Sequence, residues 1–129
     1  MSSRGYVLDA SALLCLFFEE SGAERVAALL PGARASAVNI AEVIAKLADR
    51  GVDAERIAED IAELDLEIVA FDQRQAQIAG LLRDPTRHLG LALGDRCCLA
   101  LARALGATAV ATDRAWLELR GRVAVEIVR

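Results

Sequence analysis

The sequence is poor in lysine, histidine and aromatic residues. Of its 15 basic residues only Lys46 is a lysine, its one histidine is His88, and it has Trp 1, Tyr 1 and Phe 3 among 129 residues. The net charge of -4 argues against a protein that coats nucleic acid with a broad basic face. A lone histidine without a Gly-x-Ser-x-Gly elbow does not support a serine triad. The Walker loop and the Gly-x-Gly-x-x-Gly motif for phosphate binding are also missing.

Cysteine and long apolar runs are equally scarce. The three cysteines, Cys15, Cys97 and Cys98, are odd in number and lack metal-site spacing, which predicts buried, reduced thiols and favours a cytoplasmic protein. The apolar run near the start is interrupted by Asp9 and shows no clear small-residue cleavage pattern. No stretch reaches the roughly 20 apolar residues of a membrane span, so we expect no contact with a membrane.

Apolar runs with strand character alternate with helical patterns along the chain. This order predicts an α/β fold, a three-layer α/β/α sandwich with a mostly parallel central sheet, in a single domain over residues 1–129. The hydrophobic content of 55% suits helices packed closely on such a sheet. Strands are expected to end at Asp9 and to cover 34–38, 66–71, 107–111 and 123–128. Helices are expected over 11–18, 23–30, 39–50, 53–64, 73–83 and 95–105, with a short one around Trp116.

Residues that favour helix caps mark several of these starts. Ser21 to Glu24 resembles a capping box, and Asp72 to Gln75 resembles another. Asn39 is expected to open the helix that ends at Arg50, and Asp53 to cap the next one.

Four acids differ from the other fifteen because apolar sequence surrounds them at element boundaries. Asp9 and Asp113 would close strands, whereas Glu42 and Asp95 would lie in the first turn of helices, where the helix dipole favours a carboxylate. In a parallel sheet all four boundaries can face one edge, which is where open α/β sheets bind ligands. Four clustered carboxylates repel one another by roughly 1 to 4 kcal/mol per pair at about 4 Å, so we expect a cation among them.

An all-oxygen ligand set without paired His or Cys favours Mg²⁺, with Mn²⁺ possible, over Zn²⁺. A hard divalent ion that keeps coordinated water suits the attack of water on a phosphodiester, because it lowers the pKa of that water and neutralises charge on the phosphoryl oxygens. Such an ion also supplies local positive charge, so an acidic protein can still be a nuclease.

The sequence around these acids resembles the PIN-domain ribonucleases and, among them, the VapC-type toxins of bacterial toxin-antitoxin pairs. The resemblance covers essentially the whole chain, and the four motifs in this order are much more specific than any one of them. The motifs are Asp9-x-Ser11, Asn39-x-x-Glu42, Leu93-Gly94-Asp95-Arg96 and Thr112-Asp113-x-x-Trp116.

The resemblance implies a Mg²⁺-dependent endoribonuclease that is the toxin of a type II pair. Asp9 and Asp95 would be the main metal ligands, and Glu42 and Asp113 would complete the catalytic site directly or through water. The residues that would orient these carboxylates are Ser11, Asn39 and Thr112.

The resemblance also implies partners. These are an RNA substrate, a second copy of the chain in a homodimer, and a cognate VapB-like antitoxin that wraps the groove near the helices after Asn39 and Asp53. Arg96 and Arg114 each follow a site acid and could reach an RNA phosphate, although surface ion pairs are the simpler interpretation.

Other classes fit less well. A haloacid-dehalogenase phosphatase needs a second Asp two residues after the first, where this chain has Ser11. A response-regulator receiver domain needs a pair of adjacent acids early in the chain and a late lysine, and no lysine follows Lys46. A PIN-like module that only binds RNA or a partner, and a nuclease that processes RNA without a toxin role, stay open.

Overall fold

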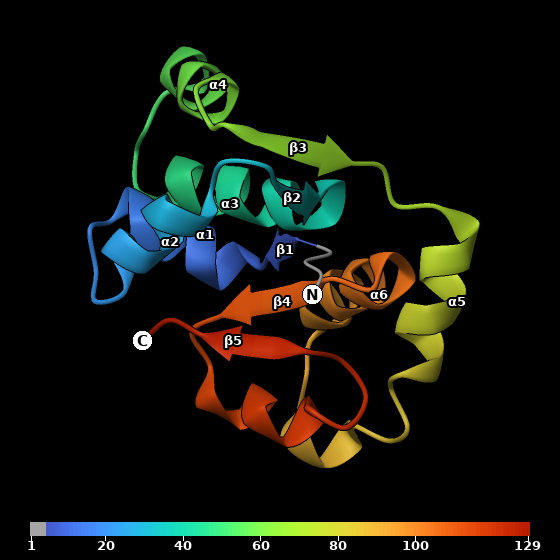
Figure 1. Ribbon diagram of the computed structural model, residues 1–129. Coiled ribbons are helices and arrows are strands. Elements are labelled where there is room, and N and C mark those ends of the chain that lie inside the picture. The colour runs from blue at the N-terminus through green and yellow to red at the C-terminus, as the bar shows by residue number, and fades with distance from the viewer. Residues whose placement is uncertain (1–4) are drawn as a thin grey trace.

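The computed structural model describes residues 5–129, and it is built on one parallel five-stranded sheet with the strand order β3-β2-β1-β4-β5 (Figure 1). β1 lies at the centre and pairs with β4 through Leu8 and Val110. The strands are β1 (Tyr6–Leu8), β2 (Ala33–Ser36), β3 (Leu66–Val69), β4 (Thr108–Ala111) and β5 (Val125–Ile127).

Helices cover both faces of this sheet (Figure 1). The α-helices are α1 (Ala10–Phe17), α2 (Ala23–Leu29), α3 (Ala37–Asp49), α4 (Ala54–Ala62), α5 (Gln73–Leu81) and α6 (Leu93–Leu105). Two 3₁₀ helices, η1 (Arg87–Leu89) and η2 (Arg114–Leu119), complete the chain.

Two large hydrophobic cores lie on opposite faces of the sheet, and a smaller cluster joins α5 to α6. Because side chains alternate along a strand, Val7 faces one core and Leu8 the other. The core around Leu8 contains residues of α1 to α4, and the core around Val7 contains residues of α6 together with Trp116 and Leu119 of η2. The predicted three-layer α/β/α sandwich is therefore confirmed. The predicted single domain also includes residues 1–4, which lie outside the described residues.

Two of the predicted helix starts are wrong. Ser36, not Asn39, caps α3, since its side chain accepts a hydrogen bond from the backbone N–H of Val38. α2 has no capping box at Ser21, because its cap is Gly22, with a φ of 99°. A Cβ at Gly22 would collide with the carbonyl oxygen of Val128, so the approach of the chain after β5 selects glycine there.

The caps at Asp53 and Asp72 agree with the sequence, although the capping box at Asp72 is only half formed, because the side chain of Gln75 donates to the carbonyl oxygen of Ala70. The side chains of Asp53 and Asp72 accept backbone N–H bonds from Arg56 and Gln75, as a capping aspartate does. The three cysteines are buried and free, as predicted. None of the helices in residues 5–129 combines the length and the apolar character that a membrane span needs.

Candidate active site

Two of the four acids follow neighbouring strands at the carboxyl edge of the sheet. Asp9 comes directly after β1 and caps α1, and Asp113 follows β4 and caps η2. Because β1 and β4 are paired in parallel, both caps lie at the same edge. Asp95 lies in the first turn of α6, as predicted, whereas Glu42 lies beyond the first turn of α3, because that helix begins earlier than predicted, at Ala37; these two helices contact each other.

Asp9 is the buried member of the group, with 4% of its surface exposed. Its Oδ2 accepts hydrogen bonds from the Ser11 hydroxyl at 2.7 Å and from the Ser11 backbone N–H at 3.2 Å. Its Oδ1 is buried without a hydrogen-bond partner. Loss of hydration raises the pKa of Asp9 to about 7, the charges of Asp95 and Glu42 add to the rise, and the Ser11 bonds oppose it.

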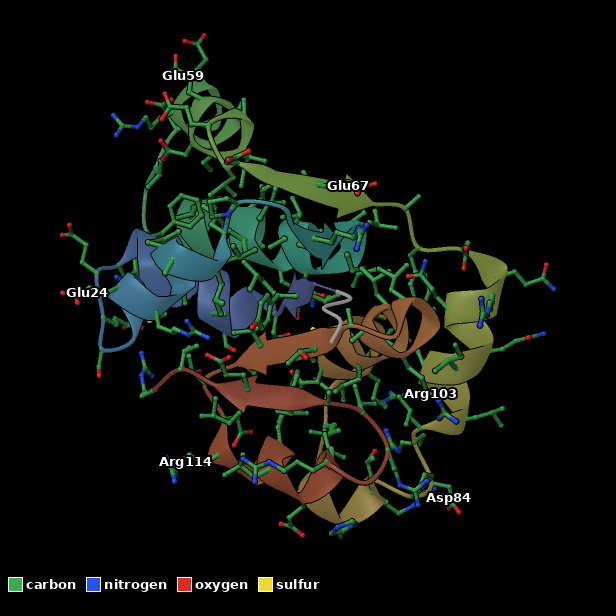
Figure 2. The ribbon with its side chains drawn as sticks, in the orientation of Figure 1. Glu24, Glu59, Glu67, Asp84, Arg103 and Arg114 are labelled. Carbon is green, nitrogen blue, oxygen red and sulfur yellow. The ribbon has the colours of Figure 1, made fainter. Side chains whose placement is uncertain are left out.

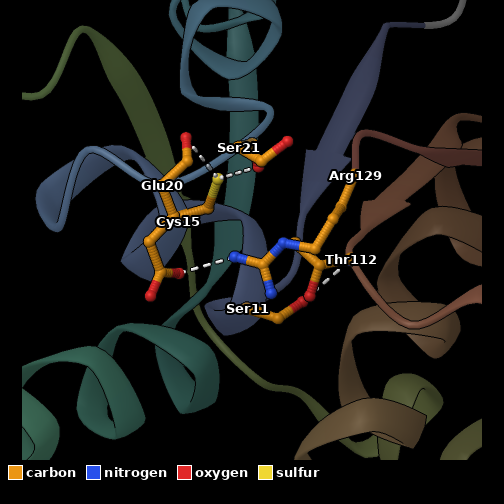
Figure 3. A network of polar contacts seen from close by, with 6 residues as sticks. All are labelled: Ser11, Cys15, Glu20, Ser21, Thr112 and Arg129. Carbon is orange, nitrogen blue, oxygen red and sulfur yellow. Dashed lines mark hydrogen bonds and ion pairs between the residues drawn. The ribbon is translucent and has the colours of Figure 1, made fainter.

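Ser11 connects the ends of the two central strands. While its hydroxyl donates to Asp9, the same oxygen accepts the backbone N–H of Thr112 at 3.2 Å (Figure 3). Thr112 thus contacts Ser11 through its backbone N–H. The position of the Asp9 carboxylate depends on the pairing of β1 with β4.

Asn39 holds Glu42 against the start of α6. Its buried side-chain amide donates to Glu42 Oε1 at 2.8 Å and to the carbonyl oxygen of Gly94 at 3.0 Å, while its Oδ1 has no hydrogen-bond partner. The Glu42 carboxylate lies so close to Gly94 that a Cβ there would collide with it. The sequence motif gives Gly94 no role, because the helix is predicted to begin after it, at Asp95, and because its contact with Glu42 joins segments that are distant in the chain.

Asp95 and Asp113 are less buried than Asp9. Oδ2 of Asp95 accepts the backbone N–H of Ala92 at 2.9 Å, which closes the first turn of α6. Partial burial raises the pKa of Asp95, the bond from Ala92 opposes this rise, and the charge of Asp113 adds to it. Asp113 is exposed, and its Oδ1 accepts the backbone N–H of Ala115 at 2.9 Å.

The carboxylate oxygens of these four acids suit a hard cation, although the side chains are not gathered closely around one point. Within residues 5–129 no group of three or more His, Cys, Asp or Glu side chains is arranged so that it could hold a metal ion. The unpartnered Oδ1 of Asp9 lies at a buried position beside two further acids, where a cation would satisfy the oxygen and lower the pKa of the carboxyl. Glu42 and Asp113 are exposed residues, and each has one carboxylate oxygen in a hydrogen bond, from Asn39 and from the Ala115 N–H respectively.

The simpler interpretation of Arg96 as a surface residue is wrong. Arg96 is 9% exposed, and its Nη1 donates to the carbonyl oxygen of Ala79 at 3.0 Å, so it joins α6 to α5. Arg114 is exposed on η2 (Figure 2). His88 belongs to η1, which carries none of the four acids. Its Nε2 lies on the surface, 3.8 Å from Oε1 of Glu118.

Comparison with known proteins gives a family and a fold. Residues 6–121 match the family described as PIN domain. A toxin-antitoxin complex from Klebsiella pneumoniae is similar, with 19% identity, coverage of 97% of this chain and 98% of the other, and a TM-score of 0.76. No curated protein matches the chain by sequence.

Two further solved structures are similar over most of their length. DNA-bound VapBC from Salmonella typhimurium is 18% identical over 97% of this chain and 98% of the other, with a TM-score of 0.75. VapC20 of Mycobacterium tuberculosis, described as a toxin that cleaves the sarcin-ricin loop, is 19% identical over 88% and 94%, with a TM-score of 0.71.

Proposed function

Because the chain belongs to the PIN-domain family, we propose that it is a metal-dependent endoribonuclease and the toxin of a VapBC-type toxin-antitoxin pair. The observation that carries the proposal is the state of Asp9. A carboxylate buried at the ligand-binding edge of a parallel sheet, with one oxygen unpartnered and two acids nearby, is destabilised unless a cation occupies the edge.

In this proposal Asp9 and Asp95 are the main ligands of Mg²⁺ or Mn²⁺, and Glu42 and Asp113 complete the site directly or through water. The bound ion would polarise the phosphodiester and lower the pKa of the attacking water. Ser11 fixes Oδ2 of Asp9 and leaves Oδ1 for the ion. Asn39 fixes Oε1 of Glu42 against α6 in the same way.

The toxin role rests on the resemblance of the whole chain and on the similar folds. The similar structures include a toxin-antitoxin complex and two VapBC complexes that are bound to DNA. We propose a VapB-like antitoxin as the protein partner of this chain, and a homodimer as its own assembly.

The first test is cleavage of a mixed structured RNA by the purified protein with Mg²⁺, with Mn²⁺ and with EDTA. We expect cleavage that needs the metal and that Asp95→Asn abolishes. The matched control is Asp84→Asn, which removes the same charge from a side chain that is 92% exposed. The assigned site would be contradicted if the folded wild type cleaved RNA equally well in EDTA, or if the folded Asp95→Asn variant cleaved it as well as wild type does.

The toxin role has a separate test. The product of a small adjacent open reading frame should copurify with the chain and inhibit its cleavage, and light scattering should report a mass of two chains. A metal-dependent nuclease whose expression does not slow growth would instead be an RNA-processing enzyme. A protein that binds RNA without cleaving it would be a binding module.

A further inference from the structure

A pocket of about 300 Å³ opens directly beside the candidate active site. Ser11 and Thr112, which share the hydrogen bond behind Asp9, contribute to its wall. The same wall carries three cationic side chains, Lys46, Arg50 and Arg129, that come from the end of α3 and from the segment after β5. The metal-site proposal assigns no role to these three residues.

The pocket has an excess of positive charge in a chain whose net charge is -4. Its one acidic lining residue, Glu20, is paired with Arg129, whose Nη2 lies 2.6 Å from Glu20 Oε1 (Figure 3). Lys46 and Arg50 form none of the ion pairs found among residues 5–129, so two positive charges remain without an acidic partner.

The two unpaired cations continue a row that begins at the acids. On α3, Asn39, Glu42, Lys46 and the capping residue Arg50 follow one another at spacings of three or four, which places them on one side of the helix. Lys46 lies roughly 6 Å, and Arg50 roughly 12 Å, beyond Glu42 along the helix axis. A strand held at the acids and running along α3 would pass both cations.

Arg50 is also held in place before any ligand binds. Its guanidinium lies 4.2 Å from the centre of the Phe18 ring, and Phe18 belongs to the pocket wall. Such a contact limits the rotamers of the arginine and directs its charge along the pocket. Less conformational freedom is then lost when an anion binds.

Stabilisation of the helix end does not explain the whole arrangement. Cations in the last turn of a helix do interact favourably with its carbonyl groups, which accounts for Lys46 and Arg50 taken alone. It does not explain why Arg129, from the other end of the chain, lines the same pocket, nor why that pocket opens beside Ser11 and Thr112.

We propose that Lys46 and Arg50 bind two phosphates of the RNA strand next to the one that is cleaved, so that the substrate runs from the acids along α3 into this pocket. The inference rests on the proposed function, because it takes RNA as the substrate. The two cations are binding residues of that substrate and stay remote from the hydrolysed bond.

The test measures RNA binding separately from cleavage. Fluorescence anisotropy follows a 5′-labelled single-stranded RNA in EDTA at several salt concentrations, with wild type and with the double variant Lys46→Gln/Arg50→Gln. We expect the double variant to bind about 10-fold more weakly or worse. The slope of log K against log salt should fall by about 1.4, because each lost phosphate contact on a single strand contributes about 0.7.

The matched control is Arg74→Gln/Arg103→Gln. It removes the same charge from a second pocket, lined in part by α5 and α6, that contains three exposed arginines, of which Arg122 is kept. We expect this control to keep the affinity within about twofold and the salt slope within about 0.3. A similar loss in both double variants would mean that only the net charge matters, and it would overturn the proposal.

Cleavage by the same proteins separates the two proposals. With Mg²⁺, the Lys46/Arg50 double variant should raise KM about 10-fold and leave kcat within about threefold, since it removes binding and not chemistry. Unchanged affinity and slope in a wild type that cleaves RNA would overturn the inference alone. Weaker binding of the variant, with no cleavage by wild type, would overturn the nuclease and leave the phosphate contacts. A wild type that binds polyglutamate but not RNA would overturn both.

Discussion

Acids on α4 and acids at the carboxyl edge of the sheet are the same residue types in opposite environments. Glu55 and Glu59 are exposed on the outer side of α4, where Glu59 points away from the molecule, and Asp60 forms a 3.0 Å ion pair with Arg56 (Figure 2). Asp9 is buried, its carboxylate accepts hydrogen bonds from Ser11 alone among residues 5–129, and further acids are its electrostatic neighbours.

The comparison shows that the two groups of acids differ in their placement and not in their residue types. On α4 water screens the charges, so the acids cost little and contribute little. At the sheet edge burial disfavours the charged form of Asp9, and folding has to tolerate this cost. Strain of this kind persists where a ligand relieves it, which is why the edge and not α4 is the candidate active site.

The largest difference between the sheet edge and α4 should appear when one acid in each region is replaced by its neutral amide. Asp9→Asn removes a proposed metal ligand of similar shape, and we expect RNA cleavage to fall about 1,000-fold, which corresponds to roughly 4 kcal/mol of transition-state stabilisation. Glu59→Gln on α4 should leave the rate within about twofold. Initial rates at saturating Mg²⁺ measure both, and comparable activity of Asp9→Asn and wild type would rule out Asp9 as a ligand.

Two glycine substitutions contrast a crowded position with an open one. Gly94→Ala places a Cβ against the Glu42 carboxylate, so we expect cleavage to fall roughly 10- to 100-fold, as for other groups that orient a ligand. Gly80→Ala on α5 meets nothing within 4 Å and should raise the free energy of unfolding by about 0.5 to 1 kcal/mol. Activity and urea unfolding of both variants give the answer. Full activity of Gly94→Ala would mean that cleavage does not need the close contact between the Glu42 carboxylate and Gly94.

The raised pKa of Asp9 predicts an unusual dependence of stability on pH. Since this pKa is about 7 in the folded protein and about 3.9 in an unfolded chain, the folded state binds more protons between these values. Without metal, the free energy of unfolding should therefore fall by roughly 2 kcal/mol as pH rises from 5 to 8. Urea titrations in EDTA measure this fall, and Asp9→Asn should largely remove it.

Addition of Mg²⁺ should oppose the loss at high pH, because the ion binds the deprotonated carboxyl. A metal-free protein whose stability increases between pH 5 and pH 8 would contradict the assigned burial of Asp9.

The smallest effect should come from the ion pair on α4. Arg56→Ala removes the partner of Asp60, yet the arginine side chain is 67% exposed, so we expect little change in the free energy of unfolding and no change in cleavage. Salt should abolish even this difference. A loss of several kcal/mol would show that the acids of α4 have a structural role.

Features that depend on residues close together in the chain could be predicted without the structure. The apolar run that ends at Asp9, the alternation of strands and helices, and the aspartates that cap α4 and α5 all express short-range rules of burial and hydrogen bonding. The four acids could be singled out because each lies in apolar sequence at an element boundary. Their assignment as ligands stays a prediction.

Contacts between distant segments were not readable in the same way. The bond from Asn39 to Gly94 spans 55 positions, and it explains why Asn39 lies inside α3 instead of capping it. Likewise, nothing local indicates that Ser11 accepts the N–H of Thr112, or that Arg129 and Lys46 line one pocket.

The sequence by itself determined the fold class, the order of the elements and the set of acids, because hydrophobic periodicity and capping chemistry act over a few residues. Only the tertiary structure decided that Asp9 is the buried acid, that Glu42 is seated against Gly94, and that cations gather beside Ser11. Burial and long-range electrostatics depend on which distant segments meet, as β1 meets β4 in the sheet and α3 meets α6 at Gly94.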